Sequence, residues 1–253
     1  MKLKDRVAFV TGGASGIGLA ISHALAREGA RVAVADIDAA SARRAVAEIQ
    51  AAGGNAVAQP LDVTDVTAVD SSIDGVAAHW KGLHVLVNCA GWDRPMPFVE
   101  TTPEFWDRIL AVNLRGPLAC TRAALRHMIR AEYGKIVSIA SDAGRVGSSG
   151  EAVYSACKGG IIALTKTLAR ELVGKGVTLN TLCPGPTDTA ILRSFLEGAE
   201  GARIAEGLKR AIPMRRFGVP EDYPGLVAFL LSDDAAYITG QTISVSGGLT
   251  MHG

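Results

Sequence analysis

The chain has 253 residues and a formal net charge of +1 at pH 7, and 48% of its residues are apolar. This length fits one α/β domain. The balanced charge argues against a nucleic-acid-binding protein, and no apolar run approaches the ~20 residues of a membrane span. We therefore expect neither a nucleic acid nor a membrane as a partner.

Two further features favour a cytoplasmic protein. Three basic residues precede the apolar run Val7–Val10, as in a signal peptide, but cleavage there would destroy the glycine-rich motif that follows at once. The four cysteines, at positions 89, 120, 157 and 183, have no spacing typical of disulfides, so we expect buried free thiols in a reducing compartment. The five histidines show no ligand spacing, and we expect no metal site.

Short β-branched runs alternate with amphipathic stretches along the whole chain. The runs expected as strands are Val7–Thr11, Arg31–Asp36, Ala56–Leu61, Val85–Asn88, Ile136–Ser141, Val177–Cys183 and Thr242–Val245. The stretches expected as helices are Gly16–Glu28, Ala39–Ala52, Val66–Trp80, Pro103–Arg130, Ala152–Val173 and Glu221–Leu231. Such alternation indicates right-handed βαβ units. We therefore predict an α/β fold, a single-domain Rossmann fold over residues 1–253, with a doubly wound parallel sheet of about seven strands and helices on both faces.

Local signals support two of these helix boundaries. Asp38 can cap the N-terminus of the second helix, and Gly53 can end that helix. Thr102 followed by Pro103 is typical of an N-cap and a first helical residue.

Residues 189–212 depart from this rhythm. The segment Ile191–Ala211 favours helix, contains glycines at 198, 201 and 207, and lies between a strand end and the next helix. Ligands of this architecture bind at the carboxyl ends of the strands, so we expect a substrate-binding lid here. An ordinary surface excursion is the alternative.

The glycine-rich motif Thr11–Gly18 follows the first strand and opens the first helix. Gly12, Gly16 and Gly18 allow a tight turn, close approach of a pyrophosphate and tight helix–strand packing. The helix N-terminus then offers unpaired backbone N–H groups to the phosphates. The motif therefore predicts a dinucleotide-binding site.

Asp36, at the end of the second strand, indicates which dinucleotide binds. A carboxylate there can accept hydrogen bonds from both ribose hydroxyls of NAD. It would repel the 2′-phosphate of NADP by about 4 kcal/mol at a separation of about 4 Å and an effective dielectric constant near 20. Arg43 and Arg44 lie a turn or more downstream, where we expect them to face solvent. The sequence therefore favours NAD over NADP.

Tyr154 and Lys158 lie one helical turn apart and can point into one cleft. A nearby ammonium stabilises the phenolate and lowers the tyrosine pKa from about 10. A shift of about three units needs roughly 4 kcal/mol, which a lysine in a partly dry site, helped by a cationic cofactor ring, can supply. The pair predicts a tyrosine acid/base, and a chance spacing is the alternative.

Taken together, these residues resemble the short-chain dehydrogenase/reductase family over essentially the whole chain. The motifs that match in order and spacing are Thr11–Gly18, Asn88–Gly91, Asn113, Ser141, the Tyr154/Lys158 pair and Pro184–Thr189. The resemblance implies an NAD-dependent enzyme that interconverts a secondary alcohol and a ketone of a small-molecule substrate. It also implies a homotetramer, with Ala152–Val173 and the C-terminal tail in its interfaces.

The resemblance assigns roles to individual residues. The implied catalytic residues are Tyr154 as general acid/base, Lys158 as the group that lowers its pKa and binds the nicotinamide ribose, Ser141 as the holder of the substrate oxygen, and Asn113 as the support of a proton-relay water. The implied cofactor-binding residues are Gly12, Ser15, Gly16, Ile17, Gly18, Asp36, Ile37, Asp62, Val63, Asn88, Ala90, Gly91, Tyr154, Lys158, Pro184, Gly185, Thr187 and Thr189. The alternatives are structural, since Asn113 could bend a long helix and Ser141 could end a strand.

Cys89 departs from the family pattern, in which a second asparagine is common at this position. We expect the thiol to change the packing of the cleft rather than its chemistry.

A narrower resemblance concerns the substrate. The segments Gly91–Asp93, Ser141–Gly160, Pro184–Thr189 and Ser244–Met251 are similar to the 2-hydroxycyclohexanecarboxyl-CoA dehydrogenases, a branch of alicyclic and aromatic acid degradation. This resemblance implies a β-hydroxyacyl-CoA thioester as substrate. Trp92 and Met96 could form an apolar wall for it. The basic residues that could meet the CoA phosphates, or could simply be solvated, are Arg145, Arg193, Lys209 and Arg210.

Three function classes are distinguishable in the sequence. A secondary-alcohol dehydrogenase needs the complete Asn–Ser–Tyr–Lys set, which the chain has. A non-catalytic dinucleotide-binding module would tolerate loss of Tyr154 or Lys158, and neither is lost. A serine hydrolase would need a Gly-x-Ser-x-Gly elbow, which the sequence lacks. Within the first class the alternative is a 3-oxoacyl-carrier-protein reductase, a branch that usually prefers NADPH, and Asp36 argues against it.

Overall fold

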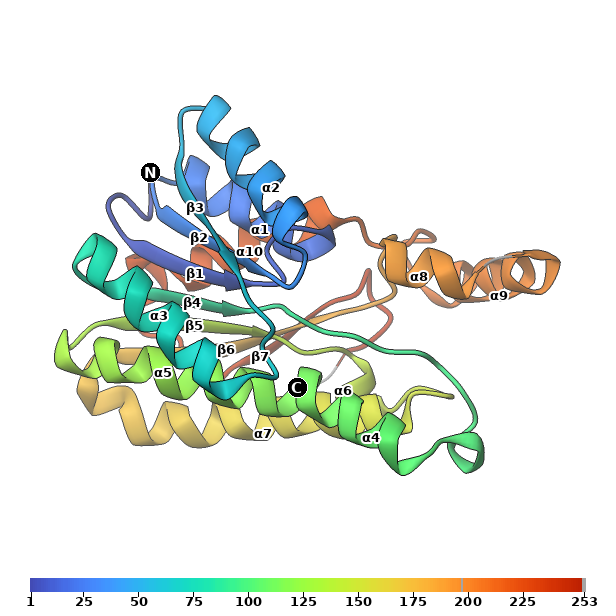
Figure 1. Ribbon diagram of the computed structural model, residues 1–253. Helices are drawn as coiled ribbons and strands as arrows, with labels where there is room; N and C mark the ends of the chain where they lie inside the picture. Colours follow the sequence, from blue (N-terminus) through green and yellow to red (C-terminus); the bar gives the residue numbers. More distant parts are fainter. Residues whose placement is uncertain (197, 252–253) are drawn as a thin grey trace.

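The computed structural model describes residues 1–196 and 198–251. Its centre is a seven-stranded sheet in the order β3-β2-β1-β4-β5-β6-β7 (Figure 1). Every paired strand in this sheet is parallel to its neighbour. The strands are β1 (Val7–Thr11), β2 (Arg31–Asp36), β3 (Asn55–Pro60), β4 (Val85–Asn88), β5 (Gly134–Ile139), β6 (Val177–Pro184) and β7 (Thr242–Val245). This arrangement confirms the predicted doubly wound Rossmann fold.

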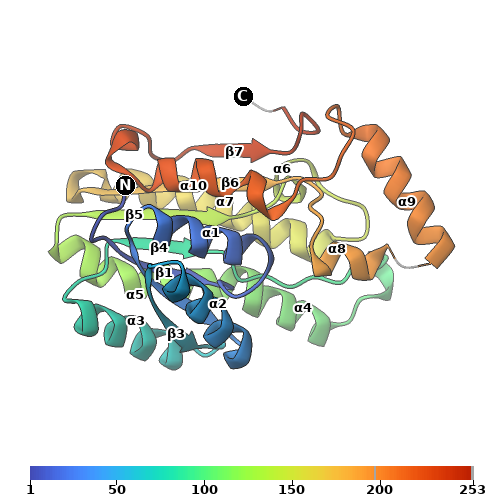
Figure 2. The ribbon, with the colours of Figure 1, turned by 90° about the horizontal axis from the view of Figure 1, so that it is seen from above.

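The helices cover both faces of the sheet (Figures 1 and 2). Their bounds are α1 (Gly16–Arg27), α2 (Ala39–Ala51), α3 (Val66–Trp80), α4 (Pro103–Leu110), α5 (Gly116–Arg130), α6 (Ala143–Val146), α7 (Ala152–Leu172), α8 (Ala190–Phe195), α9 (Gly198–Ala211) and α10 (Pro224–Leu230). Helices α1, α2 and α10 pack on one face, and α3, α5 and α7 pack on the other. None of the helices in the described part of the chain is long and apolar enough to cross a membrane.

Burial on both faces explains the composition of the strands. All residues of β1, β4, β5 and β6 are buried. Central parallel strands of this kind are near-continuous apolar runs, because helices remove both of their faces from water. Successive side chains along β1 therefore point alternately into two separate cores. Val10 lies in the core on the α1 side, and Phe9 lies in the core on the α3 side.

The predicted helix boundaries are confirmed where capping residues mark them. The Asp38 side chain accepts hydrogen bonds from the backbone N–H groups of Ala40, at 2.9 Å, and Ser41, at 3.1 Å. Thr102 accepts one from Phe105 N at 3.3 Å. Gly53 follows the end of α2 with φ of +84°, a conformation that glycine adopts without strain.

The prediction of one helix over Pro103–Arg130 is wrong. A π-helical segment, Ala111–Arg115, separates α4 from α5 and contains Asn113. The sequence marks this boundary with Gly116 and Pro117, which lie directly after the segment, since proline lacks the N–H that a continuous helix needs. Such segments occur frequently at functional sites.

The prediction that Ser141 ends a strand is also wrong. Strand β5 ends at Ile139, two residues earlier, and Ser141 lies in the loop that leads to α6. There its Oγ accepts a hydrogen bond from Ala143 N at 3.1 Å. The side chain is therefore placed by a turn at the carboxyl end of the sheet.

The inserted segment forms two helices, α8 and α9, which extend away from the sheet (Figure 2). Of the range 189–212, Glu197 lies outside the described residues. A bridge between Thr187 and Gly218 closes the base of the segment. In this bridge Asp188 N donates to Gly218 O at 2.8 Å, and Gly218 N donates to Pro186 O at 3.0 Å. The segment is thus anchored at its base, beside the end of β6.

Candidate active site

The glycine-rich turn after β1 fits closely against the end of β4. Thr11 Oγ1 accepts hydrogen bonds from Cys89 N at 3.0 Å and Ala90 N at 3.1 Å. A Cβ on Gly12, whose φ is +61°, would lie 2.9 Å from Ala90 N. A Cβ on Gly18 would lie 2.0 Å from Gly12 O. The sequence therefore needs glycine at both positions to form this turn.

The other predicted residues of this turn surround the start of α1. Ser15 is the N-cap and is exposed, with extended backbone angles. Ile17 packs against the core beneath the turn. Gly16 has φ of +48°, and a Cβ there would lie 3.5 Å from Thr189 Cγ2. The turn thus leaves the helix N-terminus uncovered by side chains on one side and meets the loop after β6 on the other.

Asp36 is fixed at the end of β2 by both of its carboxylate oxygens. Oδ2 accepts a hydrogen bond from Ala14 N at 3.1 Å, and Oδ1 accepts one from Asp38 N at 3.0 Å. Ile37 is 74% exposed beside it. Arg43 and Arg44 are exposed, as the sequence predicts. The carboxylate is therefore rigidly placed next to the glycine-rich turn.

Two predicted cofactor residues follow β3. Asp62 is exposed, and its Oδ1 accepts hydrogen bonds from Thr64 N at 2.9 Å and from Thr64 Oγ1 at 2.8 Å. Val63 is buried against α5, where a Cβ on Gly116 would lie 2.9 Å from Val63 Cγ2. Packing of Val63 thus fixes the loop that presents Asp62.

Asn88 is buried, and its side chain links three elements. Its Nδ2 donates to Thr121 Oγ1 on α5 at 3.0 Å and to Ser138 Oγ on β5 at 3.3 Å. This side chain holds the end of β4 in place. Ala90 and Gly91, which come directly after Cys89, then line the site.

The end of β6 and the loop after it carry the remaining predicted cofactor residues, which are Pro184 in the strand and Gly185, Thr187 and Thr189 in the loop. Thr187 Oγ1 donates to Gly185 O at 2.8 Å and also shares a short hydrogen bond with the buried hydroxyl of Tyr223. Thr189 caps α8 by accepting from Leu192 N at 3.4 Å. The loop therefore connects the end of β6 to the start of the inserted helices.

The predicted catalytic residues meet on the other side of this cleft. Lys158 is buried, its Nζ donates to Ile139 O at 3.0 Å, and it lies 5.3 Å from the centroid of the Tyr154 ring. A Cβ on Gly91 would lie 3.7 Å from Lys158 Nζ and 3.1 Å from Asn113 Oδ1. The side chain of Ser141 hydrogen-bonds Tyr154. The structure thus brings all four residues together.

Asn113 is fully buried, and its side chain hydrogen-bonds the loop after β4. Its Oδ1 accepts from Trp92 N at 3.3 Å, and its Nδ2 donates to Trp92 O at 2.6 Å and to Ile109 O at 3.1 Å. The π-helical turn places this side chain toward Gly91 and Lys158 rather than along the helix.

The charges around Tyr154 oppose its ionisation. Burial raises the pKa of Tyr154 well above its ordinary value, and the carboxylates of Glu151 and Asp93 add to this rise, whereas the hydrogen bond with Ser141 lowers the pKa. Burial also lowers the pKa of Lys158. Burial and the two carboxylates together therefore outweigh the hydrogen bond with Ser141.

Asp93 and Glu151 are the residues of this site that the sequence analysis missed. Asp93 is 9% exposed, and burial together with a hydrogen bond to Glu151 raises the pKa of Asp93 to about 7. Glu151 is the N-cap of α7, three residues before Tyr154, and this closeness in the sequence was a usable signal.

Cys89 is half-buried and directly follows β4. Burial raises the pKa of Cys89 to about 12, so the side chain is a neutral thiol at physiological pH. Within the described residues all four cysteines are free, and no group of three or more His, Cys, Asp or Glu side chains is arranged to hold a metal ion.

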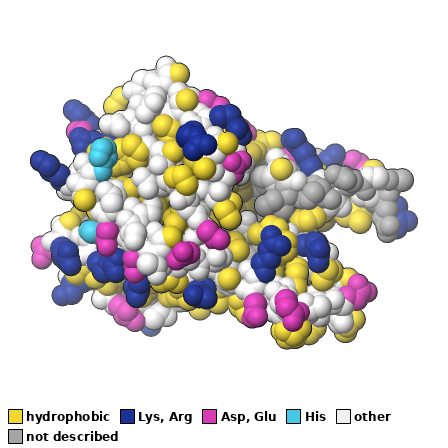
Figure 3. All heavy atoms as spheres, viewed as in Figure 1, with side chains coloured by type: hydrophobic (Ala, Val, Ile, Leu, Met, Phe, Trp, Pro, Cys, Tyr) yellow, Lys and Arg dark blue, Asp and Glu magenta, His cyan; other side chains and the backbone are white. Residues whose placement is uncertain are grey.

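Aromatic and basic side chains lie on the loop after β4 and on helices α4 and α8. The Trp92 ring packs edge-on against Phe105 at 5.9 Å, with the Arg108 guanidinium 3.8 Å from the Trp92 centroid. The Arg193 side chain forms an ion pair with Asp188 at 2.6 Å. The face in Figure 3 shows basic and acidic side chains interspersed rather than one basic field.

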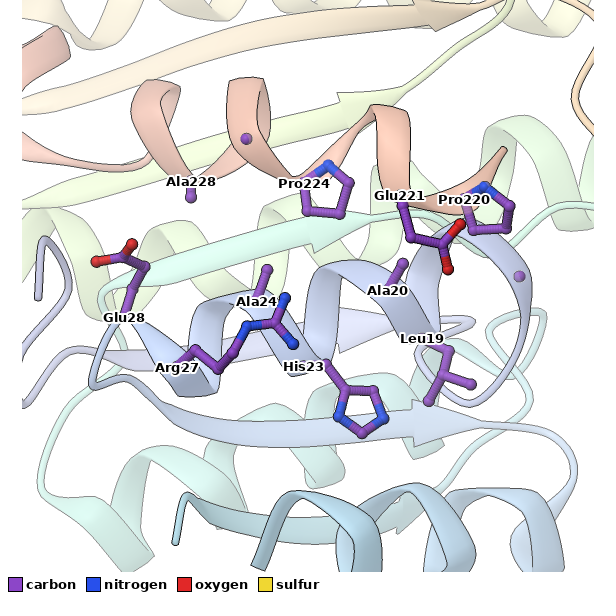
Figure 4. Close-up of a pocket in the computed structure, with 12 residues that line it drawn as sticks. Leu19, Ala20, His23, Ala24, Arg27, Glu28, Pro220, Glu221, Pro224 and Ala228 are labelled. Atoms are coloured by element: carbon purple, nitrogen blue, oxygen red, sulfur yellow. The ribbon is translucent and has the colours of Figure 1, made fainter. Parts of the chain in front are cut away.

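A separate groove of about 580 Å³ lies between α1 and the segment that leads into α10 (Figure 4). It is lined by small apolar side chains such as Ala20 and Ala24, together with Arg27 and Glu28 near one end. Gly16 lines it too, but its lining contains none of the predicted catalytic residues. The groove is therefore not where the chemistry takes place.

Comparisons with known proteins agree with this geometry. A family model described as enoyl-(acyl carrier protein) reductase matches residues 12–250. The chain is 38% identical over 250 residues to 2-(S)-hydroxypropyl-CoM dehydrogenase 3 of Xanthobacter autotrophicus, covering 98% of both proteins. It is 37% identical over 260 residues to (3R)-3-hydroxyacyl-CoA dehydrogenase of Rattus norvegicus, covering 99% of this chain and 98% of that protein.

A solved structure shows the same fold over the whole chain. This crystal structure, described as a short-chain alcohol dehydrogenase from Sinorhizobium meliloti 1021, matches with a TM-score of 0.93 and 38% identity, covering 98% of this chain and 97% of that one. The chain therefore belongs to the short-chain dehydrogenase/reductase family, oxidoreductases that act on alcohol and ketone groups with a nicotinamide cofactor.

Proposed function

We propose that the chain is an NAD-dependent dehydrogenase that interconverts a secondary alcohol and a ketone. The observation that carries this proposal is the convergence of Asn113, Ser141, Tyr154 and Lys158 at the carboxyl ends of β4 and β5. A non-catalytic dinucleotide-binding module would have no need of a buried lysine beside a half-buried tyrosine.

The residues present fit a dinucleotide. The turn has no room for a Cβ at Gly12 or Gly18. It leads into the N-terminus of α1, whose backbone N–H groups can bind phosphate. The fixed carboxylate of Asp36 can accept the ribose hydroxyls, and the exposed Ile37 can cover the adenine. When bound, oxidised nicotinamide supplies the hydride acceptor and a positive charge near the phenol.

The chain's own residues handle the proton and the orientation of the substrate. Ser141 donates a hydrogen bond to the substrate oxygen and holds it next to Tyr154 Oη. Tyr154, as tyrosinate, accepts the hydroxyl proton as the hydride leaves the carbon. Lys158 stabilises the tyrosinate and positions the ribose. Asn113 supports the proton-relay water next to Lys158. In the reverse direction Tyr154 donates the proton to the carbonyl oxygen.

NAD rather than NADP is proposed on the charge at the end of β2. Asp36 places a negative charge where the 2′-phosphate would lie. Arg44, the basic side chain that follows on α2, donates its hydrogen bond to Ser41 Oγ at 2.7 Å. This hydrogen bond directs the Arg44 side chain to its own helix.

For the substrate we propose a β-hydroxyacyl thioester, with 2-hydroxycyclohexanecarboxyl-CoA as the specific candidate. Support comes from the similarity to a 3-hydroxyacyl-CoA dehydrogenase over the full chain and from the apolar side chains of Trp92 and Met96 beside the site. We further propose that α8 and α9 form a lid over this substrate.

A cytoplasmic location is proposed because the four free thiols suit a reducing compartment.

The direct test of the function is turnover by the wild type and by Tyr154→Phe. We expect Tyr154→Phe to bind NAD normally and to lose about 10³-fold in kcat, because only the transferable proton is removed. NADH formation and NAD binding by calorimetry measure the two effects separately. Tyr237→Phe is the matched control, since Tyr237 is fully exposed. Near-normal turnover of Tyr154→Phe would refute the assigned role.

The second candidate is a 3-oxoacyl-carrier-protein reductase, which the similarity to curated proteins of that name over almost the whole chain favours. A reductase of that kind would consume NADPH with an acyl-carrier-protein thioester. Faster oxidation of NADPH than of NADH with this substrate would favour the second candidate, and the reverse order would favour the first.

A further inference from the structure

Asp142 directly follows Ser141 and carries a buried charge that the proposed reaction does not use. It is 5% exposed. Its Oδ1 accepts a hydrogen bond from Ser244 Oγ on β7, and its Oδ2 is buried without a hydrogen-bond partner among the described residues. Burying a carboxylate costs free energy that one hydrogen bond only partly offsets. Asp142 is therefore a poor source of stability, and its contacts indicate what it holds in place.

The carboxylate belongs to a chain of three side chains that joins α6 to β7. Arg145 Nη1 donates to Ser244 Oγ at 2.8 Å, and Ser244 Oγ donates in turn to Asp142 Oδ1. Arginine has only donors and a carboxylate has only acceptors, so the serine hydroxyl between them can point in only one direction. The link between the start of α6 and β7 is therefore a directed one, with a charge at each end.

The loop that carries Ser141 has two further anchors, both made by backbone. Asp142 N donates to Pro184 O at 3.2 Å, at the end of β6. A Cβ on Gly144 would lie 2.6 Å from the backbone carbonyl carbon of Lys158, so α6 packs directly on α7. These contacts hold the turn near the site, and the Asp142 side chain is the contact that reaches β7.

Strand β7 also supports the loop after β6. Gly185 N donates to Val245 O at 3.2 Å, and a Cβ on Gly185 would lie 2.8 Å from Ser246 Cβ. Ser244 therefore lies on the same stretch of backbone that holds this loop. A link from Ser244 to the turn at Ser141 fixes the Ser141 hydroxyl relative to the predicted cofactor-binding loop.

We propose that Asp142 is a positioning residue for Ser141 and acts through its hydrogen bond with Ser244. Ser141 Oγ accepts from Ala143 N at 3.1 Å, so the hydroxyl moves with the turn that Asp142 anchors. In the proposed reaction Ser141 holds the substrate oxygen beside Tyr154, and a displacement of about 1 Å in such a contact can cost about 10²-fold in rate. This kinetic consequence rests on the proposed dehydrogenase function, whereas the placement of Ser141 does not.

The first measurement follows the Ala143 amide of the full-length protein by hydrogen exchange and needs no turnover. This N–H is donated to Ser141 Oγ, so its protection reports on the place of the hydroxyl. We expect the amide to lose protection in Asp142→Ala and in Ser244→Ala. It should stay protected in Asp142→Asn, whose side-chain oxygen can still accept from Ser244. Wild-type exchange in Asp142→Ala would overturn the proposal, whatever reaction the enzyme catalyses.

The second measurement is a double-mutant cycle on kcat for alcohol oxidation. Ser141→Ala removes a donor to the substrate oxygen and should lower kcat by about 10²-fold. Asp142→Ala should lower kcat by about tenfold in the wild-type background. In the Ser141→Ala background it should cause no further loss, because the side chain that it positions is already gone. Asp142→Asn should restore the kcat that Asp142→Ala loses. Asp107→Ala, which removes an exposed carboxylate of α4, is the off-site control.

The cycle separates a positioning role from a general structural one. An equal loss from Asp142→Ala in both backgrounds would show that the residue supports the fold rather than Ser141, and would overturn the proposal. Ser244→Ala repeats the cycle from the other end of the hydrogen bond, which guards against poor folding of Asp142→Ala. If the wild type oxidises no alcohol, the proposed function fails, and the exchange of the Ala143 amide still decides whether Asp142 places Ser141.

Discussion

Tyr154 lies among groups that oppose the ionisation on which its proposed role depends. Burial and the carboxylates of Asp93 and Glu151 raise its pKa, and Lys158 is itself so buried that its pKa is lowered. A positive charge such as that of an oxidised nicotinamide would lower this pKa.

The buried Asp93 makes folding stability depend on pH. Its folded-state pKa, about 7, lies above the unfolded value of about 3.9. The folded protein therefore binds more protons between these pH values, so stability falls as pH rises through this window, and the cost is fully present above pH 7. Asp93→Asn removes this cost. We expect its stability relative to the wild type to rise from about pH 4 to pH 7 by at most about 4 kcal/mol.

Urea denaturation at a series of pH values measures this difference. Asp107→Asn controls for the change in net charge and should run parallel to the wild type. An Asp93→Asn curve that is parallel as well would contradict the raised pKa.

The single negative charge of Asp36 is the group that we propose sets the preference for NAD over NADP. In Asp36→Ala the repulsion of the 2′-phosphate is removed together with the acceptor for the ribose hydroxyls. We expect the ratio of kcat/KM for NAD to that for NADP to fall by about 10²-fold. Steady-state kinetics with both cofactors measure this ratio. An unchanged ratio would count against the assignment of Asp36 to the ribose.

At the scale of elements, the loop after β6 depends on a buried tyrosine of the segment before α10. Tyr223 is 1% exposed, and its hydroxyl hydrogen-bonds Thr187. In Tyr223→Phe the ring still fills its site, but Thr187 loses this partner, which should cost about 1–2 kcal/mol of stability. We also expect KM for NAD to rise more than kcat falls.

Thermal unfolding and cofactor kinetics check these two effects of Tyr223→Phe. Tyr237→Phe is again the exposed control and should change neither quantity. A variant with lowered stability but an unaltered KM for NAD would mean that Thr187 does not depend on this hydrogen bond to meet the cofactor.

The sequence predicts the elements well where one physical signal dominates. The central strands β1, β4, β5 and β6 are buried on both faces, and Asp38 and Thr102 mark helix starts by side-chain capping. The split of Pro103–Arg130 had a signal in the sequence, because Gly116 and Pro117 lie directly after the π-helical segment. The end of β5 was misjudged because Ala140 is buried although it lies beyond the strand.

The candidate site was predictable in part. The motifs that surround Tyr154 and the glycine-rich turn meet in one cleft, as their positions after parallel strands require. The roles of Asp93 and Glu151 were not predicted, because the two residues are far apart in the sequence and only the fold brings both near Tyr154. The side chain of Asn88 proved to hold the sheet, a contact that no local pattern contains.

At the scale of the whole molecule, α7 offers a surface for self-association. Ala152, Ala156 and Ala163 are exposed on this helix, and small side chains allow a second helix to approach closely. We propose a homotetramer that uses α7, and expect light scattering to give four times the mass of one chain. Ala163→Arg should reduce this mass, whereas Ala47→Arg on the exposed side of α2 should not. A monomeric wild type would remove the proposal.

The central claim is that this site oxidises a secondary alcohol with NAD, and NADH formation measures it most directly. The wild type is assayed with 2-hydroxycyclohexanecarboxyl-CoA, a linear 3-hydroxyacyl-CoA and a plain cyclic alcohol, each with NAD and with NADP. We predict turnover of the alicyclic thioester with NAD above all other combinations. Turnover only of the linear thioester or the plain alcohol would overturn the substrate, and no turnover of any alcohol with either cofactor would contradict the claim itself.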